Sequence, residues 1–360
     1  MISIIGAGPV GSYLAYMLAK SGFDVNVYEE HKSIGEPVQC AGIVTSELSR
    51  VLELDDKLII NRLNKVKIFS KHRSTTFNVN DIVIDRKKFD RWLADKAKKA
   101  GARFHLNHKY LGFARGNIIF ADKKNKFIKT KAEKIIGADG PLSDVAKSNF
   151  IFDKRKFYIG LQARIKGNFD LNTYEVYLGS ICPGFFAWLI PESKTIARVG
   201  TAGEKYVSQR FSKFLSIKGL SSKNIVDKQA GLIPIWNNKI RVKKSNIYLI
   251  GDAAAQVKAS TGGGIVPSLK AAKVLADSII NNKDYNKGLT KINKELKTHL
   301  RIRKILNRFS DKDYNNLIKL LSKKRVKKIL NTYNRDLSSE LVVKMLLIEP
   351  RLLCYLRKIV

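Results

Sequence analysis

The chain has 360 residues, of which 44% are hydrophobic and 27% are charged, and this balance argues against a disordered or membrane-embedded protein. The length favours two lobes, each able to build a hydrophobic core without disulfides. Lysine and arginine total 67 against 31 acidic residues, and the net charge of +36 indicates attraction to a polyanion, either nucleic acid or a phospholipid surface. A lysine-rich composition that has no binding role is the alternative.

Cysteine usage and hydropathy limit the class of protein further. Cys40, Cys182 and Cys354 lie far apart and form no CxxC pair, so we expect no metal site and no disulfide framework, and a reducing cytoplasm fits best. No run of about 18 uncharged apolar residues occurs, so we expect no transmembrane helix. The opening MISIIGAG lacks the basic region of a signal peptide and predicts a buried strand.

The N-terminal stretch ISIIGAGPVGSYLAYMLAKSG predicts a strand, a tight turn and a helix. In this turn Gly6 permits the sharp bend, Gly8 lets the backbone approach a pyrophosphate, and Gly11 allows the helix to pack closely on the strand. The N-terminus of the helix then faces the phosphates. A glycine turn that binds no ligand is the alternative.

The next predicted strand, FDVNVYEE, ends in an acid that suits a nucleotide ribose. Glu29 lies at the spacing at which a carboxylate accepts hydrogen bonds from ribose hydroxyls, and Glu30 is the second candidate. A carboxylate there repels a 2′-phosphate, so the pattern predicts FAD or NAD and disfavours NADP. Further along, residues 87–100 predict an amphipathic helix with a basic face, directly after Arg86.

Two more segments combine glycines with an acid between a strand and a helix. KIIGADGPLSDVAK, residues 134–147, carries Asp139 between two glycines and predicts a helix capped by Ser143. Residues 246–279 carry Asp252 after a strand, then three consecutive glycines, then a helix. Three glycines in a row cost backbone entropy, so the close approach of a flat ligand or a phosphate explains them better than packing.

Between these two motifs lies the apolar segment CPGFFAWLIPE, residues 182–192, in a chain that is otherwise rich in lysine. The following ESKTIARVG predicts a turn and a return strand, which places the segment on a hairpin. An aromatic lining suits a long hydrocarbon, whereas a sugar or a nucleotide would require polar walls. Ordinary sheet core is the alternative, because aromatic residues are common in strands.

The C-terminal region, residues 285–360, carries 20 lysine and arginine residues against six acidic ones, a net charge of +14. Residues 289–309 and 315–333 have leucine and isoleucine at helical spacing with lysines opposite, which predicts basic amphipathic helices. Such helices suit an anionic bilayer, each cation contributing about 1 kcal/mol near the surface. A helical cap with solvated lysines is the alternative.

The three glycine–acid motifs, in this order and at these separations, resemble the flavoprotein fold of the para-hydroxybenzoate hydroxylase type. Within that fold, GEPVQCAGIV (residues 35–44) and ASTGGGIVPSLKAA (residues 259–272) resemble the geranylgeranyl reductases, especially the archaeal enzymes that saturate isoprenoid chains of membrane lipids. The resemblance covers about 300 residues and fades after the glycine run.

The resemblance implies an α/β protein, α+β overall, in three parts. A Rossmann-type FAD-binding domain with a parallel sheet is expected over residues 1–150 and 230–284, with small strand insertions at about 62–84. An inserted antiparallel sheet that binds substrate is expected over residues 151–229, with its inner face over the isoalloxazine ring. Residues 285–360 form the basic helical region.

The resemblance also implies the cofactor contacts. The first motif holds the ADP half of FAD, Asp139 lies along the pyrophosphate, and Asp252 binds the ribityl chain. The family's Asp-Gly motif usually ends in arginine, whereas Lys147 stands here and keeps the charge without the bidentate geometry. The expected cofactor-binding residues are Gly6, Gly8, Gly11, Glu29, Cys40, Ala41, Arg86, Asp139, Asp252, Gly263, Gly264 and Ile265.

The family's substrate signature of Pro, Tyr, Trp, Phe and Pro aligns with residues 183–191 of this chain. Phe186, Trp188 and Ile190 are therefore the expected substrate contacts, with Phe186 in place of the usual tyrosine and Ile190 in place of the usual phenylalanine. Cys40 lies on a loop that in the family approaches the flavin, and it is the candidate catalytic proton donor. A small buried hydrophobe is the alternative for any single cysteine.

The function implied is an FAD-dependent reductase of isoprenoid C=C bonds, in which reduced flavin delivers hydride from N5 and the protein supplies a proton. The expected partners are an isoprenoid lipid, an electron donor, either NADPH or ferredoxin, and the inner face of the cell membrane. One alternative is an FAD-dependent monooxygenase of an apolar substrate. Another is a nucleic-acid-binding protein on a flavoprotein scaffold, which we do not expect because no RNA-recognition motif occurs.

Overall fold

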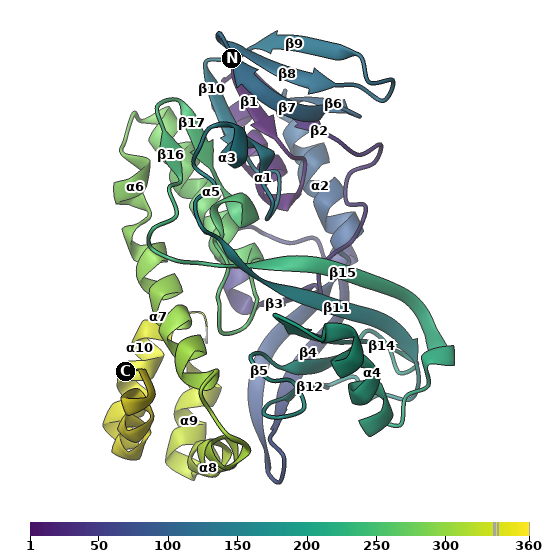
Figure 1. Cartoon of the computed structure of the whole chain (residues 1–360), viewed down its shortest axis with the longest axis vertical. Coiled ribbons are helices and arrows are strands. Elements are labelled where there is room, and N and C mark those ends of the chain that lie inside the picture. Colours follow the sequence, from purple (N-terminus) through teal and green to yellow (C-terminus); the bar gives the residue numbers. More distant parts are fainter. Residues whose placement is uncertain (334–335, 337, 360) are drawn as a thin grey trace. The chain divides into compact units, whose positions relative to one another are not determined.

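The computed structural model describes residues 1–333, 336 and 338–359 (Figure 1). The chain forms two compact units. The first unit comprises residues 1–38, 86–156 and 234–297, and the second comprises residues 39–85, 157–233 and 298–360. Each unit is therefore assembled from three separate stretches of the sequence, and each is described by itself below.

The first unit is built on a six-stranded sheet in the order β16-β17-β10-β1-β2-β6. Strands β1, β2, β6, β10 and β17 pair in parallel, and β16 joins the edge antiparallel to β17. The short apolar strands fit this position, because all four residues of β1 are buried, as in parallel sheets covered on both faces. The strands are β1 (Ile2–Ile5), β2 (Val25–Glu29), β6 (Arg103–Leu106), β10 (Lys134–Gly137), β16 (Lys243–Lys244) and β17 (Ile247–Leu249).

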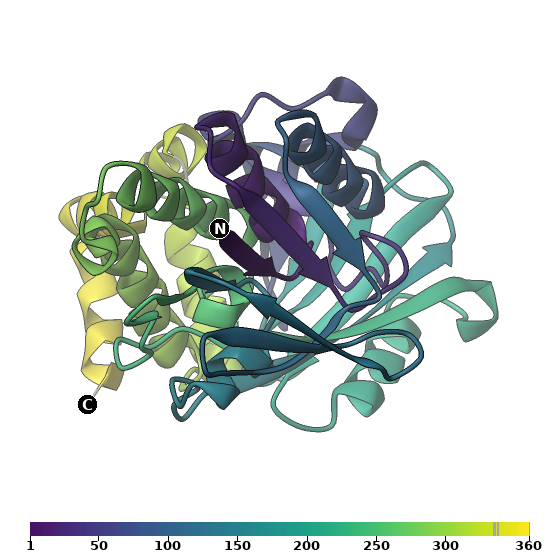
Figure 2. The same ribbon diagram turned by 90° about the horizontal axis from the view of Figure 1, so that it is seen from above.

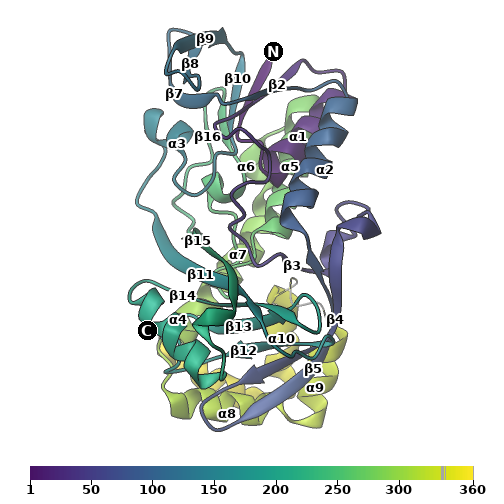
Figure 3. The same ribbon diagram turned by 90° about the vertical axis from the view of Figure 1, so that its right-hand side faces the viewer.

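Different layers cover the two faces of this sheet. Helices α1 (Pro9–Lys20), α2 (Arg86–Lys99) and α5 (Ile265–Ile280) lie on one face, and α1 packs against the other two (Figures 2 and 3). The opposite face carries a three-stranded antiparallel sheet, whose Tyr110, Ile118 and Phe120 share one core with Ile5 and Tyr28. Its strands are β7 (Lys109–Ala114), β8 (Asn117–Ala121) and β9 (Phe127–Lys131). The predicted Rossmann-type domain with a parallel sheet is thereby confirmed.

The first unit is completed by short helices and by part of a longer one. These are α3 (Asp144–Ser148), the 3-10 turn η4 (Gly251–Ala254), α6 (Tyr285–Gly288) and α7 (Thr290–Leu306), whose residues are divided between the two units.

The second unit is built on an eight-stranded sheet in the order β15-β11-β14-β13-β12-β4-β5-β3. Strand β13 pairs antiparallel with β12 and β14, as the predicted hairpin requires, whereas β12 pairs in parallel with β4. The strands are β3 (Ile43–Thr45), β4 (Ile59–Phe69), β5 (Ser74–Ile84), β11 (Lys156–Lys166), β12 (Thr173–Tyr177), β13 (Ala187–Pro191), β14 (Ile196–Gly203) and β15 (Ile225–Ile235).

Helices of the second unit include three from the C-terminal region, and α8 and α9 pack against β5. The predicted amphipathic segment 315–333 is divided into two helices that meet at Ser322 and Lys323. A capping box at Ser310 starts the first of them, since Ser310 and Asp313 exchange hydrogen bonds. The helical elements are η1 (Ser46–Leu48), η2 (Asp56–Leu58), α4 (Val207–Ile217), η3 (Ser222–Asn224), α8 (Asp311–Leu321), α9 (Lys324–Thr332), α10 (Ser338–Ile348) and η5 (Pro350–Ile359).

The compact units divide the chain differently from the predicted domains. Residues 39–61, expected in the cofactor domain, belong to the second unit, and residues 285–297, expected in the helical region, belong to the first. Strands β4 and β5, expected as small insertions in the cofactor domain, are 11 residues long and belong to the second unit, because β4 pairs with β12. Residues 298–360, expected as a separate helical region, also belong to the second unit. No helix in the described ranges is both long enough and apolar enough to cross a bilayer.

The turn after β1 depends on a glycine with a left-handed backbone. Gly6 has φ +104°, and a Cβ atom there would lie 2.4 Å from the carbonyl oxygen of Ala138. We expect Gly6→Ala to lower the free energy of unfolding by about 2–4 kcal/mol, because backbone strain and a main-chain clash add. Urea denaturation measures the change.

The matched control is Gly22→Ala, since Gly22 has φ +83° with no atom within 4 Å of an added Cβ. It should cost only about 1 kcal/mol of backbone strain. Equal losses for the two variants would contradict the close packing of the first turn on Ala138.

Candidate functional site

The three glycine–acid turns meet at one edge of the first unit's sheet. Strands β1, β10 and β17 are parallel neighbours, so the residues that follow them, Gly6, Asp139 and Gly251, emerge from the same edge. The turns also touch: a Cβ on Gly6 would contact the main chain of Asp139 at 3.0 Å, and one on Gly251 would lie 3.5 Å from Val10. Motifs more than 100 residues apart therefore form one cradle in the first unit.

The start of α1 leaves room for a ligand beside its backbone. Gly8 is the N-cap residue of α1, and no side chain caps the helix there. A Cβ added to Gly8 would have no atom within 4 Å. Gly11 has a different task, because a Cβ there would lie 2.1 Å from the carbonyl oxygen of Gly6. The helix can thus pack on the turn while its N-terminal N–H groups stay open to an anion.

Glu29, at the end of β2, points back at this turn. Its Oε2 accepts a hydrogen bond of 2.8 Å from the Ala7 N–H, and its Oε1 accepts one of 3.0 Å from the His31 N–H. His31 Nδ1 also lies 2.6 Å from Oε1. Each carboxylate oxygen has more than one acceptor position, so the anchored side chain can still receive hydroxyl groups. Glu30, the second candidate, is exposed.

Asp139 shapes the second turn. Its two carboxylate oxygens accept hydrogen bonds from the Ser143 hydroxyl at 2.6 Å and from the Val145 N–H at 3.0 Å. Ser143 in turn accepts from the Ala146 N–H at 3.0 Å, which confirms the predicted cap of α3. Burial raises the pKa of Asp139 to about 6, against the lowering effect of these hydrogen bonds. The carboxylate therefore holds the loop in shape as well as lying in the cradle.

Asp252, Arg86 and the glycine run lie together at the third turn. Burial raises the pKa of Asp252 to about 6, and the nearby positive charge of Arg86 opposes this shift. A Cβ on Gly264 would lie 3.3 Å from Asp252 Oδ1, so a glycine is needed where α5 begins. Gly263 accepts a hydrogen bond of 3.1 Å from the Lys258 N–H, and Ile265 is the first residue of α5.

Arg155 is a cation of this unit that the sequence motifs did not indicate. Lys147, which takes the place of the family's arginine, forms an exposed pair with Asp144 at 2.8 Å. Arg155 instead donates from Nη1 to the Ala253 carbonyl at 2.5 Å, and its buried Nη2 has no partner among the described residues. Buried donors are normally satisfied, so this group fits an anion. Arg155 lies beyond the helix of the Asp-Gly motif, so no motif spacing indicates it.

These features test whether the first unit fits a dinucleotide. An open glycine at a helix start, an anchored carboxylate, a spare guanidinium donor and a glycine beside a buried acid match the phosphates and hydroxyls of such a ligand. The described residues contain no group of His, Cys, Asp or Glu arranged to hold a metal ion. The donor set therefore suits a dinucleotide cofactor.

In the second unit, Trp188 is the second residue of β13 and is buried. Its indole Nε1 donates to Gln162 Oε1 at 2.9 Å, and Gln162 Nε2 donates to Gln229 Oε1 at 3.2 Å. Gly200 is its register partner on β14, and a Cβ there would lie 2.4 Å from the indole ring. Gly200 thus makes room for the ring, and Gln162 satisfies its one polar atom.

Phe186 belongs to a small aromatic cluster that includes a buried cation. Its ring stacks on Phe185 with centroids 4.3 Å apart and meets Trp188 edge-on at 5.9 Å. The guanidinium of Arg303, on α7, lies 4.6 Å from the Phe185 ring centroid. Phe186 itself is half-buried, which leaves part of its ring accessible. The cluster gives this part of the sheet an apolar surface backed by positive charge.

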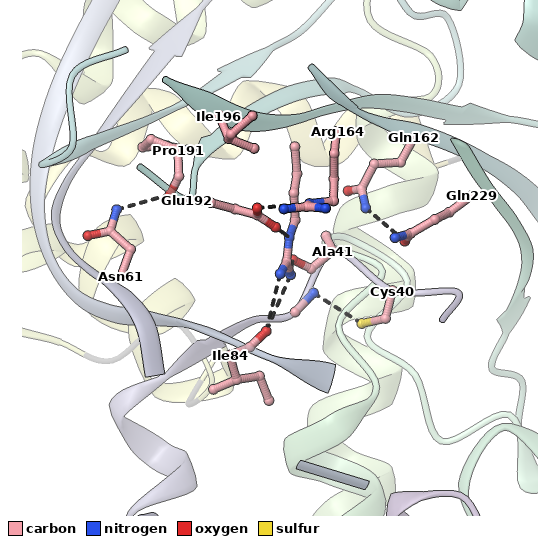
Figure 4. Close-up of polar contacts among 12 residues, drawn as sticks. Cys40, Ala41, Asn61, Ile84, Gln162, Arg164, Pro191, Glu192, Ile196 and Gln229 are labelled. Carbon is pink, nitrogen blue, oxygen red and sulfur yellow. Dashed lines mark hydrogen bonds and ion pairs between the residues drawn. The ribbon is translucent and has the colours of Figure 1, made fainter. Parts of the chain in front are cut away.

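Ile190 has polar neighbours on the same sheet. Its register partner on β14 is Arg198, whose partner on β11 is Arg164. Both arginines bind Glu192, at 2.5 Å from Arg198 Nε and 2.9 Å from Arg164 Nε (Figure 4). The expected wall is therefore apolar around Phe186 and Trp188, and ionic beside Ile190. An arginine in the otherwise apolar strand IARVGTAG is the sequence signal for this network.

Cys40 and Ala41 belong to the second unit, on the loop before β3. Cys40 Sγ accepts a hydrogen bond of 3.3 Å from the Gly42 N–H, and the Ala41 carbonyl accepts one of 2.5 Å from Arg198 Nη1. Cys182 differs, because its buried thiol contacts Thr201 and Ala202 and burial raises its pKa. Cys40 is thus the less buried of the two thiols. Its loop is held by the hydrogen bonds at Ala41 and Gly42.

Two family models match parts of the chain, the lycopene cyclase protein family over residues 192–346 and an NAD(P)-binding Rossmann-like domain over residues 4–44. The chain is 30% identical over 306 aligned residues to digeranylgeranylglycerophospholipid reductase of Methanosarcina acetivorans, covering 77% of this chain and 74% of that protein. The chain belongs to the digeranylgeranylglycerophospholipid reductase family. A second member, reductase 3 of Methanosphaera stadtmanae, is 28% identical over 99% of this chain and 98% of its own length.

Solved structures have the same fold. A geranylgeranyl bacteriochlorophyll reductase-like protein of Thermoplasma acidophilum aligns with a TM-score of 0.85 at 23% identity, over 100% of this chain and 98% of its own. A flavoprotein/dehydrogenase of Cytophaga hutchinsonii aligns with a TM-score of 0.69 at 17% identity, over 92% and 91%. The resemblance to the reductases is confirmed, and the flavoprotein fold supports a flavin in this member of the digeranylgeranylglycerophospholipid reductase family.

The raised pKa of Asp252 has a consequence for the stability of the apoprotein. The folded protein keeps this proton up to about pH 6, whereas a free aspartate side chain has a pKa of 3.8. The folded state therefore binds more protons between about pH 4 and 6, and the free energy of unfolding falls as the pH rises through that range. Two pH units correspond to an upper bound of about 3 kcal/mol, which partial solvent contact reduces to about 1–2 kcal/mol.

Asp139, whose pKa is also raised to about 6, adds a similar slope. We expect Asp252→Asn to remove roughly half of the combined slope and to stabilise the apoprotein at pH 7 by about 1–2 kcal/mol. Denaturant unfolding between pH 4 and 8 measures it. The control is Asp144→Asn, which removes an exposed carboxylate of the same unit. Equal slopes for the wild type and Asp252→Asn would contradict a raised pKa.

Proposed function

We propose that this chain is an FAD-dependent reductase that saturates the isoprenoid C=C bonds of geranylgeranyl chains on membrane glycerophospholipids or their precursors. The observation that carries the proposal is the 30% identity to a named reductase across three quarters of both chains. The convergence of three glycine–acid turns in one unit supports it independently, because a reductase of unactivated alkenes needs a strong hydride donor.

FAD is the dinucleotide that we assign to the cradle. The open start of α1 would receive the pyrophosphate, Glu29 would accept ribose hydroxyls, and Asp252 would accept from the ribityl chain. Arg86 and Arg155 supply positive charge in the same unit. The residues proposed to contact FAD are Gly6, Gly8, Gly11, Glu29, Cys40, Ala41, Arg86, Asp139, Asp252, Gly263, Gly264 and Ile265.

Saturating an isolated C=C bond requires a hydride on one carbon and a proton on the other. The bound, reduced flavin supplies the hydride. The chain orients the alkene, excludes water and provides the proton. We assign the hydrocarbon contacts to Phe186, Trp188 and Ile190, since the bond from Trp188 to Gln162 satisfies the one polar atom of the indole ring. The aromatic rings would also stabilise positive character on a substrate carbon during protonation.

Cys40 is the acid that we propose for the proton. Its thiol lies on a loop held at Ala41 and Gly42, and it is not sealed in the core as Cys182 is. A thiol can donate a proton to one alkene carbon while positive character develops on the other, which accepts the hydride, and the resulting thiolate can be reprotonated from solvent afterwards. Either NADPH or ferredoxin is the proposed electron donor, and dithionite replaces both in the assay of reductase activity.

We also propose that the protein works at the inner face of the cell membrane. Residues 285–360 carry a net charge of +14. Val343 and Leu347 lie one turn apart on α10 with exposures of 57% and 75%, and Leu353 on η5 is 47% exposed. Lys344 lies between the first two in the sequence. Apolar side chains beside cations suit insertion into the interface of an anionic bilayer.

The reductase activity is tested with purified protein. We expect it to release FAD on denaturation and, after anaerobic reduction with dithionite, to convert digeranylgeranylglycerophospholipid to products heavier by two hydrogens per reduced bond. Cys40→Ser should lower kcat by about 100-fold, as expected for loss of a general acid, while Cys354→Ser should not change it. Product mass spectrometry measures both effects. Lipid-triggered oxygen uptake with gain of an oxygen atom would contradict the proposal and indicate a monooxygenase.

Membrane binding is tested by sedimentation with vesicles of phosphatidylglycerol or phosphatidylcholine. We expect binding to the anionic vesicles only, weakened about tenfold or more by Leu347→Glu, because this change removes an inserted apolar side chain and adds a repelled charge. Leu111→Glu places the same charge at another exposed leucine, 44% exposed on β7, and should have much less effect. Equal weakening by both variants would contradict insertion through α10.

A further inference from the structure

Arg198 is a buried arginine in the middle of the second unit's sheet. It lies on β14, and its side chain is 7% exposed. Nε donates to Glu192 Oε1 at 2.5 Å, and Nη1 donates to the Ala41 carbonyl at 2.5 Å (Figure 4). The carbonyl oxygen of Ile84 lies 3.4 Å from both terminal nitrogens. One guanidinium therefore joins β14 to the residue after Cys40 and to the end of β5.

Arg198 can be buried because a buried acid next to it compensates its charge. Glu192 is equally buried and also accepts from Arg164 at 2.9 Å, and Arg164 lies 3.3 Å from Asp227. Glu192 thus neutralises Arg198 at one edge of the guanidinium. The opposite edge of the guanidinium can bind backbone carbonyls. Because the guanidinium is planar, it fixes the angle between these carbonyls and the Glu192 carboxylate. Arg164 touches Glu192 but has no contact with the Cys40 loop among those described.

Gly42 completes the arrangement from the side of the loop. It has φ +68°, and a Cβ there would lie 2.2 Å from Arg198 Nη1 and 2.7 Å from the Ile84 carbonyl. The glycine is therefore required for the guanidinium to reach Ala41. Gly42 also donates its N–H to Cys40 Sγ at 3.3 Å and accepts from the Ile84 N–H at 2.9 Å. The turn from Cys40 to Gly42 is held by Arg198, by β5 and by its own thiol.

We propose that Arg198 is a positioning residue that fixes the Cys40–Gly42 turn and so sets the direction of the Cys40 thiol. The functional part of this proposal rests on the proposed role of Cys40 in alkene reduction. Arg198 does not touch the reacting atoms. It holds the carbonyl adjacent to Cys40, and loss of that contact releases the turn while the sheet around it remains intact.

The first experiment measures alkylation of Cys40 by iodoacetamide in the native protein, by peptide mass spectrometry. Arg198→Lys removes the fork, and the double variant Arg198→Met with Glu192→Gln removes both buried charges together. We expect Cys40 to react about tenfold faster in each. The exposed Cys354 serves as the standard of reactivity, and the buried Cys182 should stay protected, which reports an intact fold. The control Arg164→Met should leave the Cys40 rate within twofold.

The second experiment disturbs the same contact from the loop. Gly42→Ala should raise the Cys40 rate about tenfold, because the added methyl group displaces the guanidinium. Gly219→Ala is the matched control in the same unit, with φ +64° and no atom within 4 Å of an added Cβ. It introduces the same backbone strain without the clash, and it should leave Cys40 unchanged. If the double variant with Arg198→Met makes Cys182 reactive, its fold is disturbed. The Arg198→Lys and Gly42→Ala variants then decide whether Arg198 positions the turn.

The third readout separates this proposal from the reductase function. In the lipid assay, Arg198→Lys should lower kcat about tenfold and change KM less than twofold, because positioning acts on the chemical step and not on lipid binding. Unchanged Cys40 alkylation in Arg198→Lys and Gly42→Ala would overturn the positioning role, whatever the activity. A wild-type protein without reductase activity whose Cys40 rate still responds to Arg198 would support the positioning of the turn and overturn the proposed function instead.

Discussion

Parallel pairing of β1 with β10, and of β10 with β17, is the constraint on which the first unit depends. The pairing aligns Ile5 with Gly137 and Gly137 with Leu249, so the three strands end level with one another. Each strand is then followed by a glycine that turns the chain across the same edge. A one-residue change of register would turn each side chain toward the other face of the sheet and would also separate Gly6 from Ala138. The register of these strands therefore determines whether the three turns meet to form the cradle.

The cradle could be predicted from the sequence because its signals are local. Gly6, Gly8, Gly11 and Glu29 lie within one strand–turn–helix–strand unit. Gly11 packs on Gly6 and Gly8 has open space beside it, whereas the contact of Gly6 with Ala138 comes from the fold. Ser143 was recognisable as a cap for the same reason. Arg155 was not, since its partner Ala253 lies 98 residues away and no motif links the two.

Features that depend on strand register across the second unit could not be predicted. Gly200 makes room for Trp188, which lies opposite it on the neighbouring strand. Arg198 binds the Ala41 carbonyl, 157 residues earlier in the chain. Strands β4 and β5 were expected as insertions in another domain because nothing local indicates pairing with β12 about 110 residues later. The expected aromatic lining likewise did not include the ionic row that Arg164, Glu192 and Arg198 add beside Ile190.

The hydrogen bonds from Trp188 through Gln162 to Gln229 have a fixed polarity. An indole nitrogen can only donate, so Gln162 must present its oxygen to Trp188 and its amino group to Gln229. This relay is one-way, and it sets the orientation of an amide whose two ends would otherwise be interchangeable. Position 162 can then be filled only by a side chain that accepts at one end and donates at the other, a chemical demand that glutamate or methionine of nearly equal size could not meet.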